Sequence, residues 1–366
     1  MSCDFFRLAN SGVQGLMPYQ PGKPIEELAR ELGLNPDTIV KLASNENPLG
    51  PSPLALSAIQ QATQDLTRYP DGSGFRLKSV LAAQLDLSRQ QITLGNGSND
   101  LLDLIARCWL APGRNAVYSE YAFAVYPLVT QAAGAGHKVV PAKDWGHDLP
   151  AMAEAIDDKT SVVFIANPNN PTGTWLSEKQ ITEFMDQVPP EVLVVLDEAY
   201  CEYVQESVYP DGVELLKRYE NLIVCRTFSK AYGLAALRVG YSLSSAQVAE
   251  TLNRVRQPFN VNSLALEAAL AAYSDSEYLA QSITTNQAGM LQLETEFRAL
   301  GLNYIPSVGN FVCVAFDDAE AVNQQLLAQG VIVRGLRPYR MNQHLRVSIG
   351  LPEENQRLID VLQTVI

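Results

Sequence analysis

The chain has 366 residues, of which 47% are hydrophobic and 18% are charged, and its formal net charge is −13. This composition is that of a folded protein, and a length above roughly 250–300 residues favours one large domain with a smaller one. The acidic balance argues against nucleic acid or an anionic membrane as the main partner. No apolar run approaches the ~20 residues of a membrane span.

The few cysteines and histidines indicate neither disulfides nor a metal centre. The cysteines at positions 3, 108, 201, 225 and 313 are odd in number, form no CxxC pair and mostly have apolar neighbours. We interpret them as reduced core cysteines of a cytoplasmic protein. The three histidines lack the spacing of metal ligands, so we expect no metal site. The first residues show no long apolar stretch behind a basic segment, and we therefore expect no signal peptide.

Residues 1–40 are predicted to form an arm, because their pattern is irregular and rich in proline apart from a short helical pattern over residues 25–32. From residue 41 to 260, short apolar runs alternate with helical patterns, which is typical of a large α/β domain. The expected strands are residues 92–94, 115–118, 137–140, 161–166, 193–196, 222–226 and 239–242. The expected helices are residues 53–63, 74–85, 99–110, 124–133, 177–187 and 245–255.

The apolar runs of the large domain hardly alternate with polar residues, which indicates strands that are covered on both faces. We therefore predict an α/β fold in which a mostly parallel sheet is wound with helices. Residues 261–366 have a different pattern and predict a smaller α+β domain, completed by the N-terminal arm. Its expected helices are residues 264–272, 278–300 and 319–329, and its expected strands are residues 311–316, 331–333 and 344–349.

Polar side chains follow three of the expected strands at the point where each strand ends. Asn170 follows one strand, Asp197 and Tyr200 follow the next, and Ser229 and Lys230 follow a third. Ligands of open α/β sheets bind outside the carboxyl ends of the strands. We therefore expect these five side chains to line one pocket, although they are far apart in the sequence.

Lys230 is the candidate for covalent chemistry. It follows the apolar run Leu222–Cys225 after a few small, polar and cationic residues. A partly desolvated ammonium group loses its proton more easily, and the free amine can then attack a carbonyl group. Taken alone, the segment is explained equally well by a solvated lysine after a strand.

A glycine-rich turn, Gly95-Asn96-Gly97-Ser98-Asn99, joins the first expected strand of the large domain to an apolar helix. Free backbone N–H groups and the helix dipole make such a helix start an anion site. The turn resembles half of a GxGxxG fingerprint, with Asp100 in place of the third glycine. A structural turn explains it as well as a phosphate site does.

Together these residues supply the groups that a phosphorylated aldehyde cofactor requires. Its phosphate needs an anion site, which Ser98, Asn99, Ser229 and Arg238 can form. Its aldehyde carbon needs a lysine, which is Lys230.

The ring of such a cofactor has further requirements. Its pyridine nitrogen needs a carboxylate to keep it protonated, which Asp197 provides, so that the ring can withdraw electrons from the substrate. Its phenolic oxygen needs donors, which are Tyr200 and Asn170. Its face needs a flat apolar contact, for which Phe123 and Tyr126 are the candidates.

An amino-acid-like substrate needs an arginine that can bind its carboxylate through two hydrogen bonds, and Arg346 lies in a suitable strand. Each of these residues also has a structural interpretation. Asp197 could cap a helix, Phe123 could belong to the core, and Arg334 and Arg346 could lie on the surface. A coincidence of all these alternatives in this order is far less expected than any one of them.

The motifs follow one another as Gly97-Ser98-Asn99, Asn167–Gly173, Asp197 with Tyr200, Ser229-Lys230, Arg238 and Arg346. Further matching segments are residues 17–23, 42–48, 68–72, 227–235 and 330–334. This order resembles the fold-type I pyridoxal-phosphate aminotransferases, and within them the histidinol-phosphate aminotransferase family, over nearly the whole chain.

The resemblance implies pyridoxal phosphate as the cofactor and a homodimer with active sites at the subunit interface. It implies that Tyr69 reaches the cofactor phosphate of the partner and that Tyr19 helps to close the site. Arg334 would meet the distal phosphate of the substrate or the γ-carboxylate of glutamate. The matching motifs also assign Asn47 to the substrate and Thr227 to the cofactor.

Two positions depart from the family pattern. The family often has Tyr where this chain has Phe123, and Asp or Glu near Asn99. Stacking against the ring survives the first change, and backbone contacts survive the second.

The implied reaction is transamination between histidinol phosphate and 2-oxoglutarate in histidine biosynthesis. The alternatives are an aromatic amino acid aminotransferase and an enzyme like threonine-phosphate decarboxylase, since both would use the same lysine and aspartate. A non-catalytic regulator is disfavoured, because every catalytic position is filled and no basic patch is visible.

Overall fold

The computed structural model describes residues 3–366 and contains two sheets. The larger sheet has seven strands in the order β2-β8-β7-β6-β5-β3-β4. Its central pairs are parallel, whereas β8 runs antiparallel to both of its neighbours. The bounds are β2 Ile92–Gly95, β3 Asn115–Ser119, β4 Gly136–Val140, β5 Thr160–Ala166, β6 Leu193–Asp197, β7 Leu222–Thr227 and β8 Gly240–Leu243.

Helices cover both faces of this sheet, as β5 shows. Val163 and Ile165 point into one hydrophobic core, together with Phe184 of α9. Val162 and Phe164 point into a second core on the other face. Because successive side chains of a strand point to opposite faces, a continuous apolar run fills both cores.

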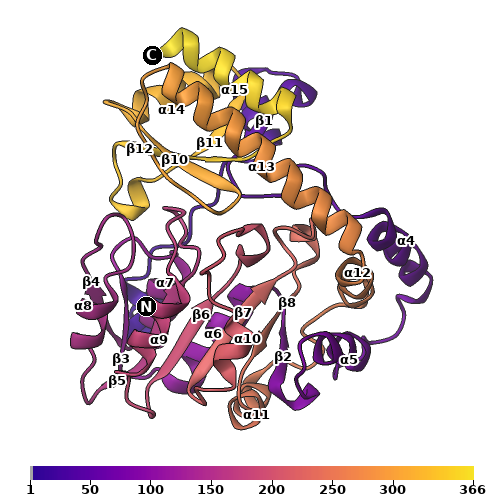
Figure 1. Ribbon diagram of the computed structural model, residues 1–366, viewed down its shortest axis with the longest axis vertical. Coiled ribbons are helices and arrows are strands. Elements are labelled where there is room, and N and C mark those ends of the chain that lie inside the picture. The colour runs from indigo at the N-terminus through magenta and orange to yellow at the C-terminus, as the bar shows by residue number, and fades with distance from the viewer. Residues whose placement is uncertain (1–2) are drawn as a thin grey trace.

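The helices of this part alternate with its strands (Figure 1). Ser52 begins one of them, since its hydroxyl accepts the N–H of Ala55 and Pro53 occupies the first turn. The bounds are α4 Pro53–Ala62, α5 Phe75–Gln84, α6 Ser98–Trp109, α7 Val125–Ala132, α8 Leu149–Glu154, α9 Glu178–Met185, α10 Gly212–Leu216, α11 Ala246–Val255 and α12 Ser263–Tyr273.

The second sheet has the strand order β1-β11-β12-β10-β9 and lies at the other end of the molecule in Figure 1, beneath three helices. It has a hydrophobic core of its own. The strands are β1 Val40–Leu42, β9 Tyr304–Ile305, β10 Phe311–Ala315, β11 Val331–Gly335 and β12 His344–Ser348, and the helices are α13 Ser276–Ala299, α14 Ala319–Ala328 and α15 Pro352–Val365. The domain boundaries at residues 40 and 260 stay predictions.

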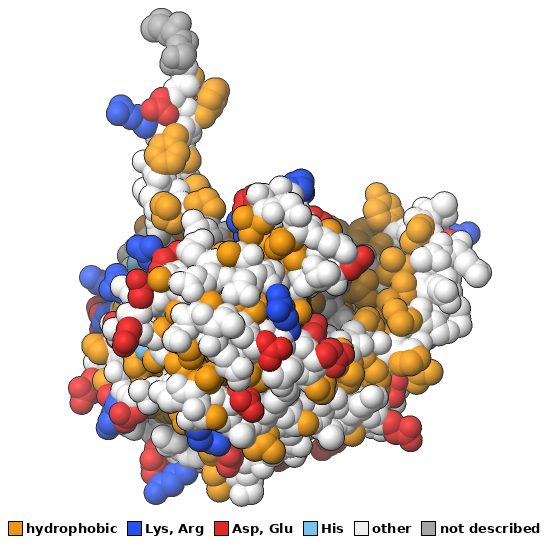
Figure 2. Space-filling model, turned by 90° about the horizontal axis from the view of Figure 1, so that it is seen from above, with side chains coloured by type: hydrophobic (Ala, Val, Ile, Leu, Met, Phe, Trp, Pro, Cys, Tyr) orange, Lys and Arg blue, Asp and Glu red, His pale blue; other side chains and the backbone are white. Residues whose placement is uncertain are grey.

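The N-terminal segment forms three helices, α1 Phe5–Leu8, α2 Ser11–Gln14 and α3 Ile25–Leu32. Figure 2 shows its first part projecting from the body with hydrophobic side chains on it. The exposed fractions of Phe5 and Leu8 are 78% and 70%. Strand β1 then pairs in parallel with β11, so this end of the chain extends the second sheet.

The structure contains elements that the pattern did not predict, among them β1, β9, α8, α10 and α15. Most are two to six residues long, too short for a period to be read. In the longer α15, the buried Leu358, Ile359 and Leu362 have the i, i+1, i+4 spacing of a helix, so the sequence does carry a signal for this element. Within residues 3–366, no helix is both long and apolar enough to span a membrane.

Candidate active site

A cavity of about 360 Å³ lies at the carboxyl ends of β5, β6 and β7. The three parallel strands end in line, so polar residues from distant parts of the sequence meet there. The cavity brings together most of the side chains that the sequence predicted, namely Tyr19, Ser98, Asn99, Phe123, Asn170, Asp197, Tyr200, Thr227, Ser229, Lys230, Arg238, Arg334 and Arg346.

Lys230 is half-buried in this cavity, and its Nζ donates a hydrogen bond to the carbonyl oxygen of Ser44 at 3.0 Å. Burial, and after it the positive charge of Arg346, lowers the pKa of the Lys230 ammonium to about 7. At neutral pH a substantial fraction of the side chain is therefore a free amine, the form that attacks a carbonyl group.

Asp197 ends β6, and its side chain is 4% exposed. Oδ2 accepts a hydrogen bond from the Tyr126 hydroxyl at 3.0 Å, whereas Oδ1 is buried without a partner in the described chain. Burial raises the pKa of Asp197 to about 6. An unpartnered buried carboxylate oxygen is costly unless a ligand satisfies it. A protonated pyridine nitrogen is such a ligand.

The start of α6 forms an anion site with Arg238. Gly97 precedes the helix with φ +84°, and a Cβ atom there would collide with the Arg238 guanidinium. Arg238 also donates to the Ser229 hydroxyl at 3.3 Å. The N–H groups at Ser98 and Asn99, the Ser229 hydroxyl and the guanidinium can hold a phosphate together.

Tyr200 lies in a hydrogen-bond network that leads to Arg346. Its hydroxyl accepts from Nδ2 of Asn45 at 3.0 Å and from Nδ2 of Asn170 at 3.1 Å. Arg346 donates to Oδ1 of Asn170 at 2.6 Å and to the carbonyl of Ala43 at 2.8 Å. The network fixes the guanidinium plane before any ligand arrives.

Asn45 is a cavity residue that the sequence did not single out. It lies in the same motif as Asn47, and only the backbone distinguishes the two. Asn45 has φ +54°, and its side chain reaches Tyr200. Asn47 does not line the cavity, because its Nδ2 donates to the Ala231 carbonyl and the Ser282 hydroxyl, both at 2.9 Å.

Tyr69 also lies outside the cavity of its own chain. Its side chain is 82% exposed and stacks on Phe259, with ring centroids 4.8 Å apart. Arg334 does line the cavity, where its guanidinium lies 5.5 Å from the centre of the Tyr19 ring and donates to the Gln20 carbonyl.

The two aromatic candidates have different positions. Tyr126 is fully buried, donates a hydrogen bond to Asp197 and stacks on Phe164 with the ring centroids 4.8 Å apart. Phe123 lines the cavity and meets Tyr126 edge-on at 5.9 Å. Phe123 is therefore the ring placed for contact with a flat ligand, and Tyr126 positions the carboxylate.

These groups fit pyridoxal phosphate. The cavity offers an amine for its aldehyde carbon, a free carboxylate oxygen for its ring nitrogen and an anion site for its phosphate. Within residues 3–366, no group of His, Cys, Asp and Glu side chains is arranged to hold a metal ion.

Comparison with known proteins gives concordant matches. The family model of aminotransferase class I and II matches residues 37–362. Histidinol-phosphate aminotransferase 2 of a Pseudomonas fluorescens strain is 64% identical, over 100% of this chain and 99% of the relative. The corresponding Pseudomonas aeruginosa protein is 62% identical, over 99% of both chains.

Solved structures agree. Histidinol-phosphate aminotransferase from Sinorhizobium meliloti, in complex with pyridoxal-5'-phosphate, has a TM-score of 0.88 at 31% identity over 97% of both chains. Aspartate aminotransferase of Thermus thermophilus has a TM-score of 0.85 at 20% identity, over 98% of this chain and 99% of that chain, and shows the fold alone.

Proposed function

The chain belongs to the class I and II aminotransferases, and from that premise we propose that it transfers the amino group of histidinol phosphate to 2-oxoglutarate in histidine biosynthesis. Its fold is that of the fold-type I enzymes and its cofactor is pyridoxal phosphate. The full-length relatives at 62–64% identity carry the name of this activity.

The structural observation that supports this substrate pair is the presence of two arginines in the cavity of Lys230. Arg334 and Arg346 are 7% and 6% exposed and line the same cavity. One substrate carries a phosphate and the other carries two carboxylates, and guanidinium groups bind both kinds of anion through paired hydrogen bonds. The same two residues can therefore serve both halves of the reaction.

The proposal also assigns roles to the other cavity residues. When bound, pyridoxal phosphate supplies an electron-withdrawing ring that stabilises negative charge at the substrate carbon bearing the amino group. We assign to the Lys230 amine the removal of the proton from that carbon and its delivery to the aldehyde carbon of the cofactor, a general acid–base contribution worth roughly 10²–10⁴-fold in rate. Asp197 would hold a positive charge at the ring nitrogen, and Tyr200 and Asn170 would bind the phenolic oxygen.

A homodimer in the cytoplasm is part of the proposal. Apolar side chains of α4, α5 and the segment between them are exposed, with Leu54 at 55%, Leu66 at 62% and Phe75 at 55%. A second copy would cover this face, because exposed apolar patches mark association surfaces. Tyr69 lies between these helices, so such a dimer would direct it towards the partner's cofactor phosphate. The buried free thiols Cys225 and Cys313 suit a reducing compartment.

Steady-state kinetics with three amino donors test the proposal. Histidinol phosphate, phenylalanine and tyrosine are compared at one concentration of 2-oxoglutarate. We expect kcat/KM for histidinol phosphate to exceed the other two by at least about tenfold, which is about 1.4 kcal/mol. A tenfold preference for phenylalanine, or release of carbon dioxide from threonine phosphate, would overturn the substrate assignment.

A further inference from the structure

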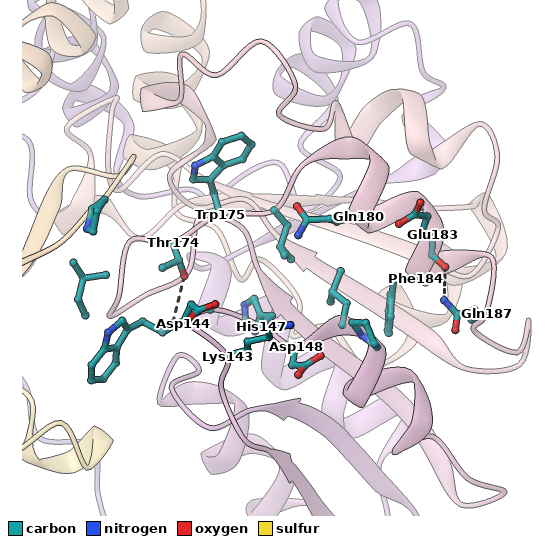
Figure 3. A pocket seen from close by; sticks show the side chains of 17 residues that line it. Lys143, Asp144, His147, Asp148, Thr174, Trp175, Gln180, Glu183, Phe184 and Gln187 are labelled. Carbon is teal, nitrogen blue, oxygen red and sulfur yellow. Dashed lines mark hydrogen bonds between the residues drawn. The ribbon is translucent and has the colours of Figure 1, made fainter.

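A second cavity, of about 760 Å³, lies beside the turn that precedes α8 (Figure 3). It is formed by that turn, by the loop before α9, by α9 itself and by β9 of the second sheet. Its lining residues differ from those of the active-site cavity. Its volume is in the range of small-molecule sites, roughly 300–1,000 Å³.

A tight turn places one indole ring at this cavity. Asp144 and Trp145 have φ values of +49° and +64°, a backbone conformation that residues with a Cβ atom rarely adopt. Lys143 and Gly146 close the turn with backbone hydrogen bonds of 3.1 and 2.8 Å. The Trp145 carbonyl also accepts from the hydroxyl of Thr174 at 3.4 Å, the contact drawn in Figure 3.

The cavity has aromatic walls from several elements. The indole of Trp145 packs against His344 of β12, with ring centroids 4.8 Å apart, and against Tyr121 at 5.3 Å. Trp175 supplies a second indole from the loop before α9, and Figure 3 shows it on the side of the cavity opposite Asp144. Indole faces attract cations more strongly than other aromatic side chains do.

The charges around the cavity also favour a cation. The lining includes three carboxylates, those of Asp144, Asp148 and Glu183, and one ammonium group, that of Lys143. Glu183 is paired with Lys179 at 3.7 Å, and Asp148 Oδ1 accepts the N–H of Ala151 at 3.3 Å. The Asp144 side chain makes no hydrogen bond or ion pair within residues 3–366. An anion would meet net repulsion here.

A buried acceptor completes the site. His147 is 8% exposed, and Nε2 donates to the Ala166 carbonyl at 2.9 Å, so Nδ1 carries a lone pair. That atom has no hydrogen-bond partner in the described part of the chain. Burial lowers the pKa of His147 to about 4, and the ring is neutral at physiological pH. A ligand N–H group would satisfy it.

We propose that this cavity is a second binding site, which takes a small planar organic cation with N–H donors, such as an amidinium or aromatic ammonium compound. The indole of Trp175 contacts its flat face, Asp144 and Asp148 balance its charge, and Nδ1 of His147 accepts one of its N–H groups. The site is separate from the active-site cavity, with which it shares no lining residue.

Isothermal titration calorimetry on the cofactor-loaded enzyme tests this site with benzamidine, and benzamide serves as the uncharged ligand of the same shape. We expect benzamidine to bind at least about tenfold more tightly than benzamide, since only the amidinium gains from the indole and the carboxylates. Trp175→Leu and Asp144→Asn should each weaken benzamidine about fivefold or more. Neither variant should change kcat/KM for transamination.

Two control variants remove the same groups elsewhere, Trp109→Phe outside this cavity and Asp158→Asn on an exposed turn. Both should bind benzamidine as the unmodified enzyme does. Equal affinity for benzamide and benzamidine, unchanged affinity in Trp175→Leu, or competition between benzamidine and 2-oxoglutarate would overturn the proposal. Transamination measured in the same samples shows separately whether the proposed function holds.

Discussion

Replacement of Asp197 by Asn is expected to abolish transamination and yet to stabilise the cofactor-free protein at pH 8. Burial raises the pKa of this carboxyl from 3.8 to about 6. The folded state therefore binds the proton more tightly than the unfolded state does. The free energy of unfolding that this proton contributes is fully present below pH 3.8. It is lost as the pH rises through about 6.

The size of the effect follows from this difference. A shift of about 2 pKa units corresponds to about 3 kcal/mol of destabilisation at pH 8. The amide of Asn can still accept the Tyr126 hydroxyl, but its N–H group would have no partner at the position of Oδ1, at a cost of roughly 1 kcal/mol. The net gain is about 2 kcal/mol. With an unfolding entropy of roughly 2.1 cal/mol/K per residue, the thermal midpoint rises by about 3 °C.

Calorimetric unfolding of the two cofactor-free proteins at pH 8 and pH 4 measures this gain. It should nearly vanish at pH 4, where the carboxyl of the folded protein is already protonated. Asp157→Asn is a control of opposite sign, because hydrogen bonds from Lys138 and Asn115 lower the pKa of Asp157 and its neutral form should be less stable at pH 8. An Asp197→Asn protein that is less stable than the parent at pH 8, or equally stabilised at both pH values, would refute the reasoning.

Three further predictions concern the reaction. Lys230→Ala should lower kcat by at least about 10²–10⁴-fold with an unchanged circular dichroism spectrum, and a parental rate would contradict its role. The rate of pyridoxal phosphate uptake by the cofactor-free protein should rise with pH around a midpoint near 7, the pKa to which burial lowers Lys230. Arg346→Gln should move that midpoint upwards, because it removes a like charge, and a midpoint near 10 in the parent would exclude a buried amine. Arg334→Gln should lower kcat/KM for histidinol phosphate by roughly 10–150-fold, corresponding to a lost charged hydrogen bond of 1.5–3 kcal/mol. The exposed Arg254→Gln should leave it unchanged.

The sequence allowed most of the fold and much of the site to be predicted, for a physical reason. Apolar runs that hardly alternate belong to buried parallel strands, and polar residues just after such strands meet at one edge of the sheet. Asp197 and Lys230 could be found in this way. Asp197 directly follows an apolar run, Lys230 follows another after four residues, and the structure places both in one cavity.

The residues that could not be predicted depend on backbone geometry and on long-range contacts. Asn45 and Asn47 differ in position because the backbone at Asn45 is left-handed, which no local pattern indicates. Tyr126 and Phe123 are both aromatic and close in sequence, and only the packing of Tyr126 on Phe164 decides which of them reaches Asp197. Tyr69 is exposed in a single chain, so its role depends on an assembly that one sequence does not display.

The central claim is that Lys230 is the residue that carries the cofactor. Reduction of the cofactor-loaded enzyme with borohydride fixes the pyridoxyl group to its lysine, and tryptic peptide mass mapping then locates it. We expect the added mass on the peptide that contains Lys230 and on no other peptide. A pyridoxyl group on a different lysine, with Lys230 unmodified, would contradict the account.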